Sequence, residues 1–477
     1  NAATEPSFVA RQPKVEANGY LVHREGYSHI EPSSPVSSRD VPSFTQLVEA
    51  NLQLRVPLGS QQHFAYADLS LIFQRGGLYY KDGGNGDRVR IPNHDVMSLR
   101  PAFVPSELYV SWSPKPWFNV LAGKKRVTWG SGFAYNPTDL INPPKDPTDP
   151  NFQRAGNWLV RLEAPFEKFT ATALFAPQAL DTTAGIPSAL VRYPSYAPAD
   201  GPDLRDSHSH YLAAARLYWL VADADVNLVY YFSNYYQDGF AKKSRLGLSF
   251  SRYFFTDYEL HVEALLSRGS SRGFADRDCM SGVARCSSTE GFAPTKLEAD
   301  RIYPRVLVGT RRQFTNEALL SFEYYYQSDG YSRSEFRDAL ELLLRAKSAE
   351  ANGAGTSVGT SVNTPTGSGT VGGSALPQRF SFNTLRRHYV IASYSQPHIY
   401  DDWTLGAVLV VGAEDLSGLF SPSVAWTAEE WLTLSLYGYV PIRGLGVNEA
   451  KLQGRSYSEY SLMPFDWRVL FEARAYY

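Results

Sequence analysis

The last twelve residues of the chain, 466–477 (DWRVLFEARAYY), alternate between two kinds of side chain almost without interruption. One parity carries Trp467, Val469, Phe471, Ala473, Ala475 and Tyr477, and the other carries Asp466, Arg468, Glu472, Arg474 and Tyr476. Because successive side chains of a β-strand point to opposite faces, this pattern predicts a strand with one apolar and one charged face. The apolar face could cover a protein core, or it could meet lipid while the charged face lines a watery lumen.

Seventeen further segments alternate well enough to be strands. The eighteen predicted strands are 15–25, 43–56, 63–74, 103–113, 117–129, 155–165, 168–177, 209–220, 223–236, 241–253, 256–268, 299–312, 316–328, 381–396, 403–413, 416–426, 431–442 and 466–477.

Short and long connections between these segments alternate along the chain. Every even connection is short, whereas the odd ones are long except at 237–240 and 414–415. The long ones are 26–42, 75–102, 130–154, 178–208, 269–298, 329–380 and 443–465. Short turns at one rim and long loops at the other are typical of an outer-membrane barrel, and an even strand number lets the first and last strands pair antiparallel. We therefore predict an all-β fold, a transmembrane antiparallel up-and-down β-barrel of about 18 strands with short periplasmic turns and long extracellular loops.

The composition agrees with this prediction. Aromatic residues make up 14% of the 477 residues, and Tyr and Trp are favoured at membrane–water boundaries. No apolar run is long enough for a transmembrane helix, and the net charge of −2 does not indicate a nucleic-acid partner. Because the chain starts at Asn1 without a leader, we interpret it as a mature outer-membrane protein of a Gram-negative cell after signal-peptide removal. We expect a periplasmic segment at 1–14 and a single barrel at 15–477, embedded in outer-membrane lipid.

Little in the sequence indicates catalysis. The nine His residues are scattered, and His208 and His210 alone are weak evidence for a metal. No constellation of nucleophile and base stands in a fitting context, so we predict that the protein is not an enzyme and holds no metal or cofactor. Cys279 and Cys286 lie in one polar segment, where either a loop disulfide or two unpaired thiols is possible, the disulfide being favoured in an oxidising compartment.

One segment has helical periodicity instead of strand alternation. In 332–349, Phe336, Leu340, Leu343 and Leu344 recur at helical spacing, which predicts a short amphipathic helix within the longest loop. Two interpretations are open: the helix packs its apolar stripe on neighbouring loops, or it acts as a lid or plug over the pore.

Charged residues dominate the parity that would face the lumen. The arginines of this set are Arg24, Arg55, Arg161, Arg216, Arg245, Arg301, Arg305, Arg311, Arg387, Arg468 and Arg474. The acids are Glu16, Glu49, Asp68, Glu107, Glu163, Asp225, Glu259, Glu263, Glu317, Glu323, Glu414 and Glu472. Since the two sets are matched in number, we expect ion-pair ladders across neighbouring strands. Arg301, Arg305 and Arg311 would form a basic stripe facing an acidic stripe of Glu317 and Glu323.

The fifth predicted strand leads into an unusual loop. Lys124, Lys125 and Arg126 are consecutive, so one of them must break the alternation or lie at a bulge. The following residues, 129–150, contain five prolines and are expected to be rigid. The loop either folds into the pore as a constriction or forms a rigid surface cap. The candidate constriction residues are Trp129, Tyr135, Asn136, Asp139, Asn142 and Lys145. The candidate pore-lining residues are Arg126, Arg161, Arg216, Arg245, Arg301, Arg305, Arg311, Glu259, Glu263, Glu323, Arg468, Glu472 and Arg474.

With eighteen alternating segments, sorted loops and an aromatic C-terminus, the chain resembles Gram-negative outer-membrane porins over nearly its full length. Its size is similar to that of the monomeric eighteen-stranded channels, which include substrate-specific porins and the alginate-export family. The resemblance implies a passive channel for small polar solutes, or for an exported polysaccharide, with selectivity from inward loops. The alternative is a structural barrel that sheaths or anchors a periplasmic, electron-transfer or secretion-complex partner.

Overall fold

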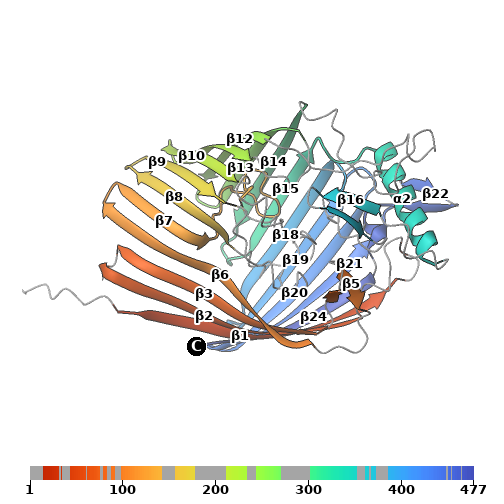
Figure 1. Ribbon diagram of the computed structural model, residues 1–477, viewed down its shortest axis with the longest axis horizontal. Coiled ribbons are helices and arrows are strands. Elements are labelled where there is room, and N and C mark those ends of the chain that lie inside the picture. The colour runs from red at the N-terminus through yellow and green to blue at the C-terminus, as the bar shows by residue number, and fades with distance from the viewer. Residues whose placement is uncertain are drawn as a thin grey trace, which may run out of the picture.

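The computed structural model describes most of the chain as one closed β-barrel (Figure 1). The described residues are 14–31, 34, 43–60, 62–75, 79–82, 88–91, 98–141, 156–177, 211–233, 243–269, 301–351, 360–364, 367–371, 385–446, 449–452, 454–463 and 465–477.

The main sheet contains eighteen strands, and each predicted strand overlaps one of them. The strands are β1 (Glu16–Ile30), β2 (Phe44–Ser60), β3 (His63–Arg75), β6 (Ser98–Lys115), β7 (Phe118–Lys125), β8 (Asn157–Pro165), β9 (Phe169–Ala176), β10 (Leu212–Val221), β11 (Ala224–Ser233), β12 (Lys243–Phe254), β13 (Tyr258–Arg268), β14 (Ile302–Gln313), β15 (Leu319–Gln327), β18 (His388–Ile399), β19 (Trp403–Gly412), β20 (Ser417–Glu429), β21 (Leu432–Ile442) and β24 (Phe465–Tyr476). The predicted all-β barrel is confirmed.

Three short hairpins in the long connections were not predicted. They are β4 (Tyr79–Asp82) with β5 (Arg88–Ile91), β16 (Thr360–Thr364) with β17 (Gly367–Val371), and β22 (Ala450–Leu452) with β23 (Arg455–Tyr457). Strands this short carry too few residues for alternation to be read from sequence.

The first and last strands close the sheet. β1 pairs antiparallel with β24, with Tyr20 opposite Tyr476 and Arg24 opposite Glu472, and it pairs with β2 on its other side. Every other neighbouring pair in the main sheet is also antiparallel. Closure leaves no edge strand in the main sheet, so all its backbone groups can be paired without water.

The two faces of the barrel differ as the alternation predicts. The outer face carries large apolar side chains that are exposed, among them Leu21, Leu71, Phe103, Val110, Val160, Leu162, Phe175, Leu246, Leu248, Leu260, Leu266, Val308, Phe322, Val390, Leu405, Leu436, Val440, Val469 and Phe471. On β24, Glu472 and Arg474 are buried on the inner side. A closed barrel with an apolar outer belt is the architecture of a membrane-spanning β-barrel, so the apolar face of the last strand faces outward.

No described helix is long and apolar enough to cross a membrane. The long helix that is present, α2 (Arg333–Ala351), lies where the sequence predicts it, at one end of the barrel with β16 and β22 (Figure 1). It begins with a capping box, because Ser332 N donates to Glu335 Oε2 at 2.7 Å and Glu335 N donates to Ser332 Oγ at 3.4 Å.

The apolar stripe of α2 packs on neighbouring loops. Phe336, Ala339, Leu340 and Leu344 are buried in one cluster with Tyr331, Leu385, Ala450, Tyr457 and Leu462. These contacts agree with the first of the two interpretations of the helix.

Several strand boundaries differ from the prediction by a few residues, and two of these differences change where charged residues lie. The fifth strand ends at Lys125 instead of 129, because the chain leaves the sheet and turns into the barrel. The strand predicted at 381–396 begins at His388, so Arg387 precedes it and pairs with Glu335 of α2. Glu414 likewise lies in the tight connection between β19 and β20, not on the inner wall.

Candidate channel constriction

Residues 126–141, here called the inner segment, follow β7 and lie inside the barrel. In Figure 1 this coil can be followed between β7 and β8, beside β13 and β15. Val127, Trp129 and Ile141 are buried against inward-facing residues of β6 to β11. Ala134 and Tyr135 are buried against inward-facing residues of β14, β15, β18, β19 and β20. The segment therefore crosses the inside of the barrel, and Asn157 at the start of β8 donates its side-chain amide to the Ile141 carbonyl.

Two carboxylates on the inner wall accept the main-chain N–H groups of this segment. Glu263 on β13 accepts from Gly132 N at 2.7 Å and from Thr138 N at 3.1 Å, and also from Ser131 N and Thr138 Oγ1. Glu323 on β15 accepts from Ala134 N at 2.8 Å and from Phe133 N. Since hydrogen bonds to charged acceptors are the stronger ones, these two side chains fix a coil that has no regular secondary structure of its own.

His261 joins the two strands that carry these carboxylates. Its ring is fully buried, and Nε2 lies 3.0 Å from Glu323 Oε1. Because a carboxylate only accepts, Nε2 must carry the hydrogen. Gly309 on β14 makes room for the ring, since a Cβ at that position would lie 2.2 Å from His261 Nε2. A substitution of this glycine would therefore displace the histidine.

Glu259 and Arg311 continue the polar network toward the short-turn rim. Glu259 accepts from Ser251 Oγ at 2.9 Å, and its Oε2 lies 3.4 Å from Arg311 Nη1. His261 Nδ1 is 3.8 Å from Glu259 Oε1. Glu259, His261 and Glu263 alternate on one strand, so their side chains share the inner face of β13.

Aromatic side chains hold the inner segment at Trp129 and at Tyr135. Trp129 lies 5.7 Å from Tyr231 between ring centroids, and the Tyr231 hydroxyl donates to the Thr138 carbonyl at 2.5 Å. Tyr135 stacks on Tyr325 at 4.8 Å. Offset aromatic pairs of this kind add to the apolar burial.

Basic side chains lie near the start of the inner segment, where the chain leaves β7. Lys125 Nζ donates to the Tyr109 hydroxyl at 3.0 Å and is 3.7 Å from Glu107 Oε1, which also accepts from Arg126 N. Arg216 Nε donates to Asn227 Oδ1 at 2.7 Å, and its guanidinium lies 5.9 Å from the Trp129 ring. Arg161 is 3.8 Å from Glu163 on the same strand. Lys125 thus points inward, and the strand ends before Arg126 has to break the alternation.

The remaining predicted pore residues are distributed around the barrel. Glu472 lies between Arg24, at 2.5 Å from Nη2, and Arg474, at 3.0 Å from Nη2. Arg305 pairs with Asp329 at 2.8 Å, and Arg301 lies 5.3 Å from the Tyr303 ring. Arg245 and Arg468 are half-buried on inward-facing positions of β12 and β24. Among the described residues, the structure therefore brings predicted pore residues together in three places: on β13–β15, at Arg24–Glu472–Arg474, and where Arg216 lies against Trp129.

The expected opposition of a basic and an acidic stripe is wrong. Glu317 lies in the turn between β14 and β15 and pairs with His398, and Glu323 is engaged by the inner segment. Arg305 and Arg311 pair instead with Asp329 and Glu259. Alternation alone could not show where β15 begins, which is at Leu319.

The acids and the arginines of the inner wall differ in exposure. Ten acids and nine arginines remain on the wall, once Arg301, Arg387, Glu317 and Glu414, which lie outside the strands, are set aside. Seven of the acids are buried: Glu49, Asp68, Glu107, Glu259, Glu263, Glu323 and Glu472. Of the arginines only Arg474 is buried. The accessible inner surface is therefore more basic than the residue count suggests.

Some predicted residues lie outside the described part of the chain. They are Asn142, Lys145, His208, His210, Cys279 and Cys286. Within the described residues, Asn136 is half-buried and Asp139 is buried in the inner segment, and no group of three or more His, Cys, Asp or Glu side chains could hold a metal.

Three residues of this site were missed as site residues: His261, Tyr231 and Thr138. The signal for His261 is the alternation of Glu259, His261 and Glu263, three ionisable side chains on one inward face. Nothing in the sequence pairs Tyr231 with Thr138, because the contact joins residues 93 positions apart.

A second buried polar group, here called the rim cluster, lies at the loop end of the barrel. Glu459 accepts from Leu385 N at 3.0 Å and from the Tyr389 hydroxyl at 2.7 Å, while its own N–H donates to Asp415 Oδ2 at 3.0 Å. The pKa of Glu459 is raised to about 7: burial is the largest cause, the Leu385 N–H opposes the shift, and the charge of Asp415 adds to it. Arg386 lies 4.9 Å from the Phe336 ring of α2 and so joins the rim cluster to the helix.

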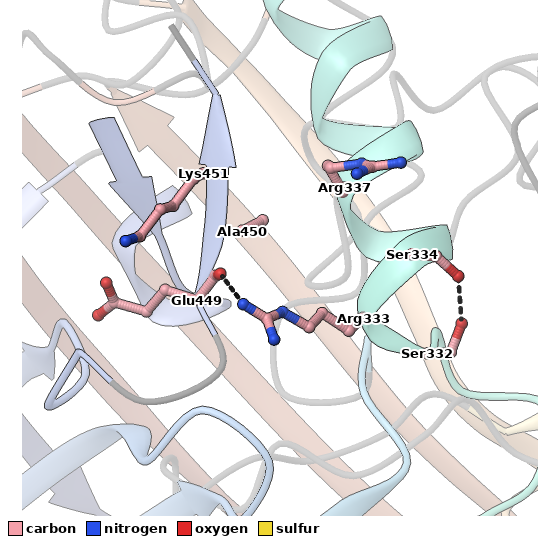
Figure 2. A pocket seen from close by; sticks show the side chains of 7 residues that line it. All are labelled: Ser332, Arg333, Ser334, Arg337, Glu449, Ala450 and Lys451. Atoms are coloured by element: carbon pink, nitrogen blue, oxygen red, sulfur yellow. Dashed lines mark hydrogen bonds between the residues drawn. The ribbon is translucent and has the colours of Figure 1, made fainter. Parts of the chain in front are cut away.

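An open pocket of about 470 Å³ lies beside α2 and is lined by Ser332, Arg333, Ser334, Arg337, Glu449, Ala450 and Lys451. Arg333 spans it and donates to the Glu449 carbonyl at 3.5 Å. Figure 2 shows that Arg337 and Lys451 point in opposite directions, so the basic groups do not converge on a common ligand position.

Neither a protein-family model nor a curated protein matches the chain. It is similar to the solved structure of Pseudomonas aeruginosa OpdQ, at 8% identity over 98% of each chain with a TM-score of 0.47. It is also similar to Acinetobacter baumannii OccAB3, at 7% identity over 97% of this chain and 99% of that chain with a TM-score of 0.46. A mutant of Rh. blastica porin matches at 7% identity over 97% of this chain and 100% of that chain, with a TM-score of 0.38. The chain's own pairing of eighteen antiparallel strands confirms the expected fold.

Proposed function

We propose that this porin-type barrel is an outer-membrane channel through which small polar solutes diffuse, and that anions pass more readily than cations. The observation that carries the proposal is the unequal exposure of charge on the inner wall. Seven of ten inner acids are buried, whereas eight of nine inner arginines remain accessible. A low-dielectric barrel concentrates the field of such a surface, and basic linings favour anions.

The inner segment supports the same proposal, because it crosses the inside of the barrel and narrows the passage. Its anchors use the carboxylates of Glu263 and Glu323, which are removed from contact with the solute. The solute would meet accessible arginines such as Arg161, Arg216 and Arg311 instead.

The test is the reversal potential of the purified protein in a planar bilayer across a gradient of KCl. We expect a sign that corresponds to greater chloride than potassium permeability. A potassium-selective or non-conducting barrel would overturn the proposal, and a barrel without conductance would favour the alternative of a sheath for a partner protein. Current block by acidic oligosaccharides, compared with neutral ones of equal length, tests whether a polysaccharide is the solute.

A further inference from the structure

We propose that Glu263, Glu323 and His261 are positioning residues that lock the inner segment in place, which makes the constriction static and not a gate. The inference rests on the proposed function only in that the segment narrows the passage. The lock itself is a property of the described contacts.

The first step is the direction of the main-chain N–H groups. Four consecutive residues, 131–134, turn their N–H groups toward the wall, two to Glu263 and two to Glu323. Successive N–H groups that converge in this way form an anion-binding concavity. Here the two anions belong to the barrel itself, so the concavity is already filled.

The second step is burial. Glu263 and His261 are both fully buried, and Glu323 is 2% exposed. A buried N–H group that loses its acceptor has no water to replace it, so the segment cannot leave the wall one bond at a time without leaving groups unsatisfied. The bonds from residues 131–134, together with those from Thr138, must break together, which opposes gating on a fast timescale.

The third step is that the two carboxylates bind different residues of the inner segment. Glu263 holds residues 131, 132 and 138, whereas Glu323 holds residues 133 and 134 and is oriented by His261. A Glu-to-Gln change keeps the shape of the side chain, replaces one of its two acceptor oxygens with an NH₂ group, and removes the charge that strengthens the bonds to the other oxygen. The structure therefore assigns a different set of protected amides to each carboxylate.

Hydrogen–deuterium exchange of the full chain in detergent, read at single-residue resolution, tests this assignment. In E263Q we expect the amides of 131, 132 and 138 to exchange about tenfold faster or more, as expected for loss of about 1.4 kcal/mol of protection. In E323Q the same acceleration should appear at 133 and 134. H261A should accelerate 133 and 134 and leave 131, 132 and 138 unchanged, and H261Q, which keeps a donor, should restore part of the protection.

The matched control is D257N, which changes a carboxylate in the turn before the same strand β13, where it pairs with Arg312. We expect wild-type exchange throughout the inner segment in this variant. Wild-type exchange in E263Q and E323Q would overturn the inference, as would equal acceleration of the segment and of strands β13 to β15. Conductance of the same proteins separates the two proposals. A wild-type barrel without conductance would contradict the proposed channel function, whereas the proposed anchoring of the inner segment is tested by the exchange pattern alone.

Discussion

Two non-strand regions are held on the same barrel by opposite means: the inner segment, and helix α2 with its buried apolar cluster, here called the α2 cap. The inner segment is a coil whose N–H groups are bound by wall carboxylates. The cap is a helix that satisfies its own N–H groups and is held by apolar burial of Phe336 and Leu340. The difference indicates that a coil needs external acceptors, whereas a helix needs only an apolar surface to lie on.

The buried carboxylates of the two regions differ in the same sense. Glu263 receives five donors from the inner segment, whereas Glu459 in the rim cluster receives two and lies beside a second carboxylate, Asp415. The first arrangement satisfies both carboxylate oxygens with hydrogen bonds. The second makes the charge of Glu459 costly.

The largest expected effect comes from a substitution that weakens the docking of α2 and leaves the inner segment unchanged. Phe336→Ala removes a fully buried ring from the α2 cluster and should weaken docking of the helix by about 3–5 kcal/mol. Limited proteolysis within α2 should become fast while amide exchange at 131–138 stays at the wild-type rate. Faster exchange in both regions would mean that the two are coupled.

A somewhat smaller effect concerns pH at the rim cluster. Because burial raises the folded pKa of Glu459 from 4.5 to about 7, the folded state binds a proton more tightly than the unfolded one. Local stability is therefore greatest below about pH 4.5 and falls as the pH rises to about 7, by about 3 kcal/mol.

Exchange at Leu385 and Arg386, measured as opening free energy from pH 4.5 to 8, checks this expectation. Glu459→Gln should abolish the slope, and the inner segment of the same protein serves as an internal reference. A wild-type rim cluster whose opening free energy does not change with pH would contradict the assignment.

The smallest effect is specific to the inner segment. Tyr231→Phe removes the hydroxyl that donates to the Thr138 carbonyl and keeps the ring against Trp129. Loss of one hydrogen bond of this kind costs about 1 kcal/mol. The amide exchange rate near Thr138 should therefore rise by less than the tenfold expected for E263Q, while the exchange rate of Leu385 does not change. An effect on Leu385 as large as that on Thr138 would argue against separate anchoring of the two regions.

The barrel could be predicted from the sequence because one physical rule is repeated along eighteen strands. Each strand presents an apolar outer face and an inner face that carries most of its charged residues, so alternation predicts the strand number. The assignment of the two rims from loop length stays a prediction. Strand ends were less certain: Lys125 and His388 are boundaries set by where the chain leaves the sheet, which depends on tertiary contacts.

The site was predictable only in its residue types. Parity placed Glu263 and Glu323 on the inner face, but it could not show that the chain's own N–H groups would bury them. The sequence gives nearly equal numbers of inward arginines and acids, eleven and twelve, but a residue count does not show which of these side chains are buried. Contacts such as Tyr231 with Thr138 join distant residues, and no local pattern encodes them.

The closing seam between β1 and β24 has a consequence for the order of folding. Gly19 and Tyr477 exchange both main-chain hydrogen bonds at 3.1 Å, and the tyrosine hydroxyl donates to the Asn51 carbonyl. A Cβ at Gly19 would lie 2.3 Å from the Tyr477 ring, so the glycine leaves the space that the final side chain fills. Until these residues meet, β1 and β24 are open edges, and the sheet is a ribbon that can pair with another chain. Barrel closure thus depends on residues separated by nearly the whole length of the sequence.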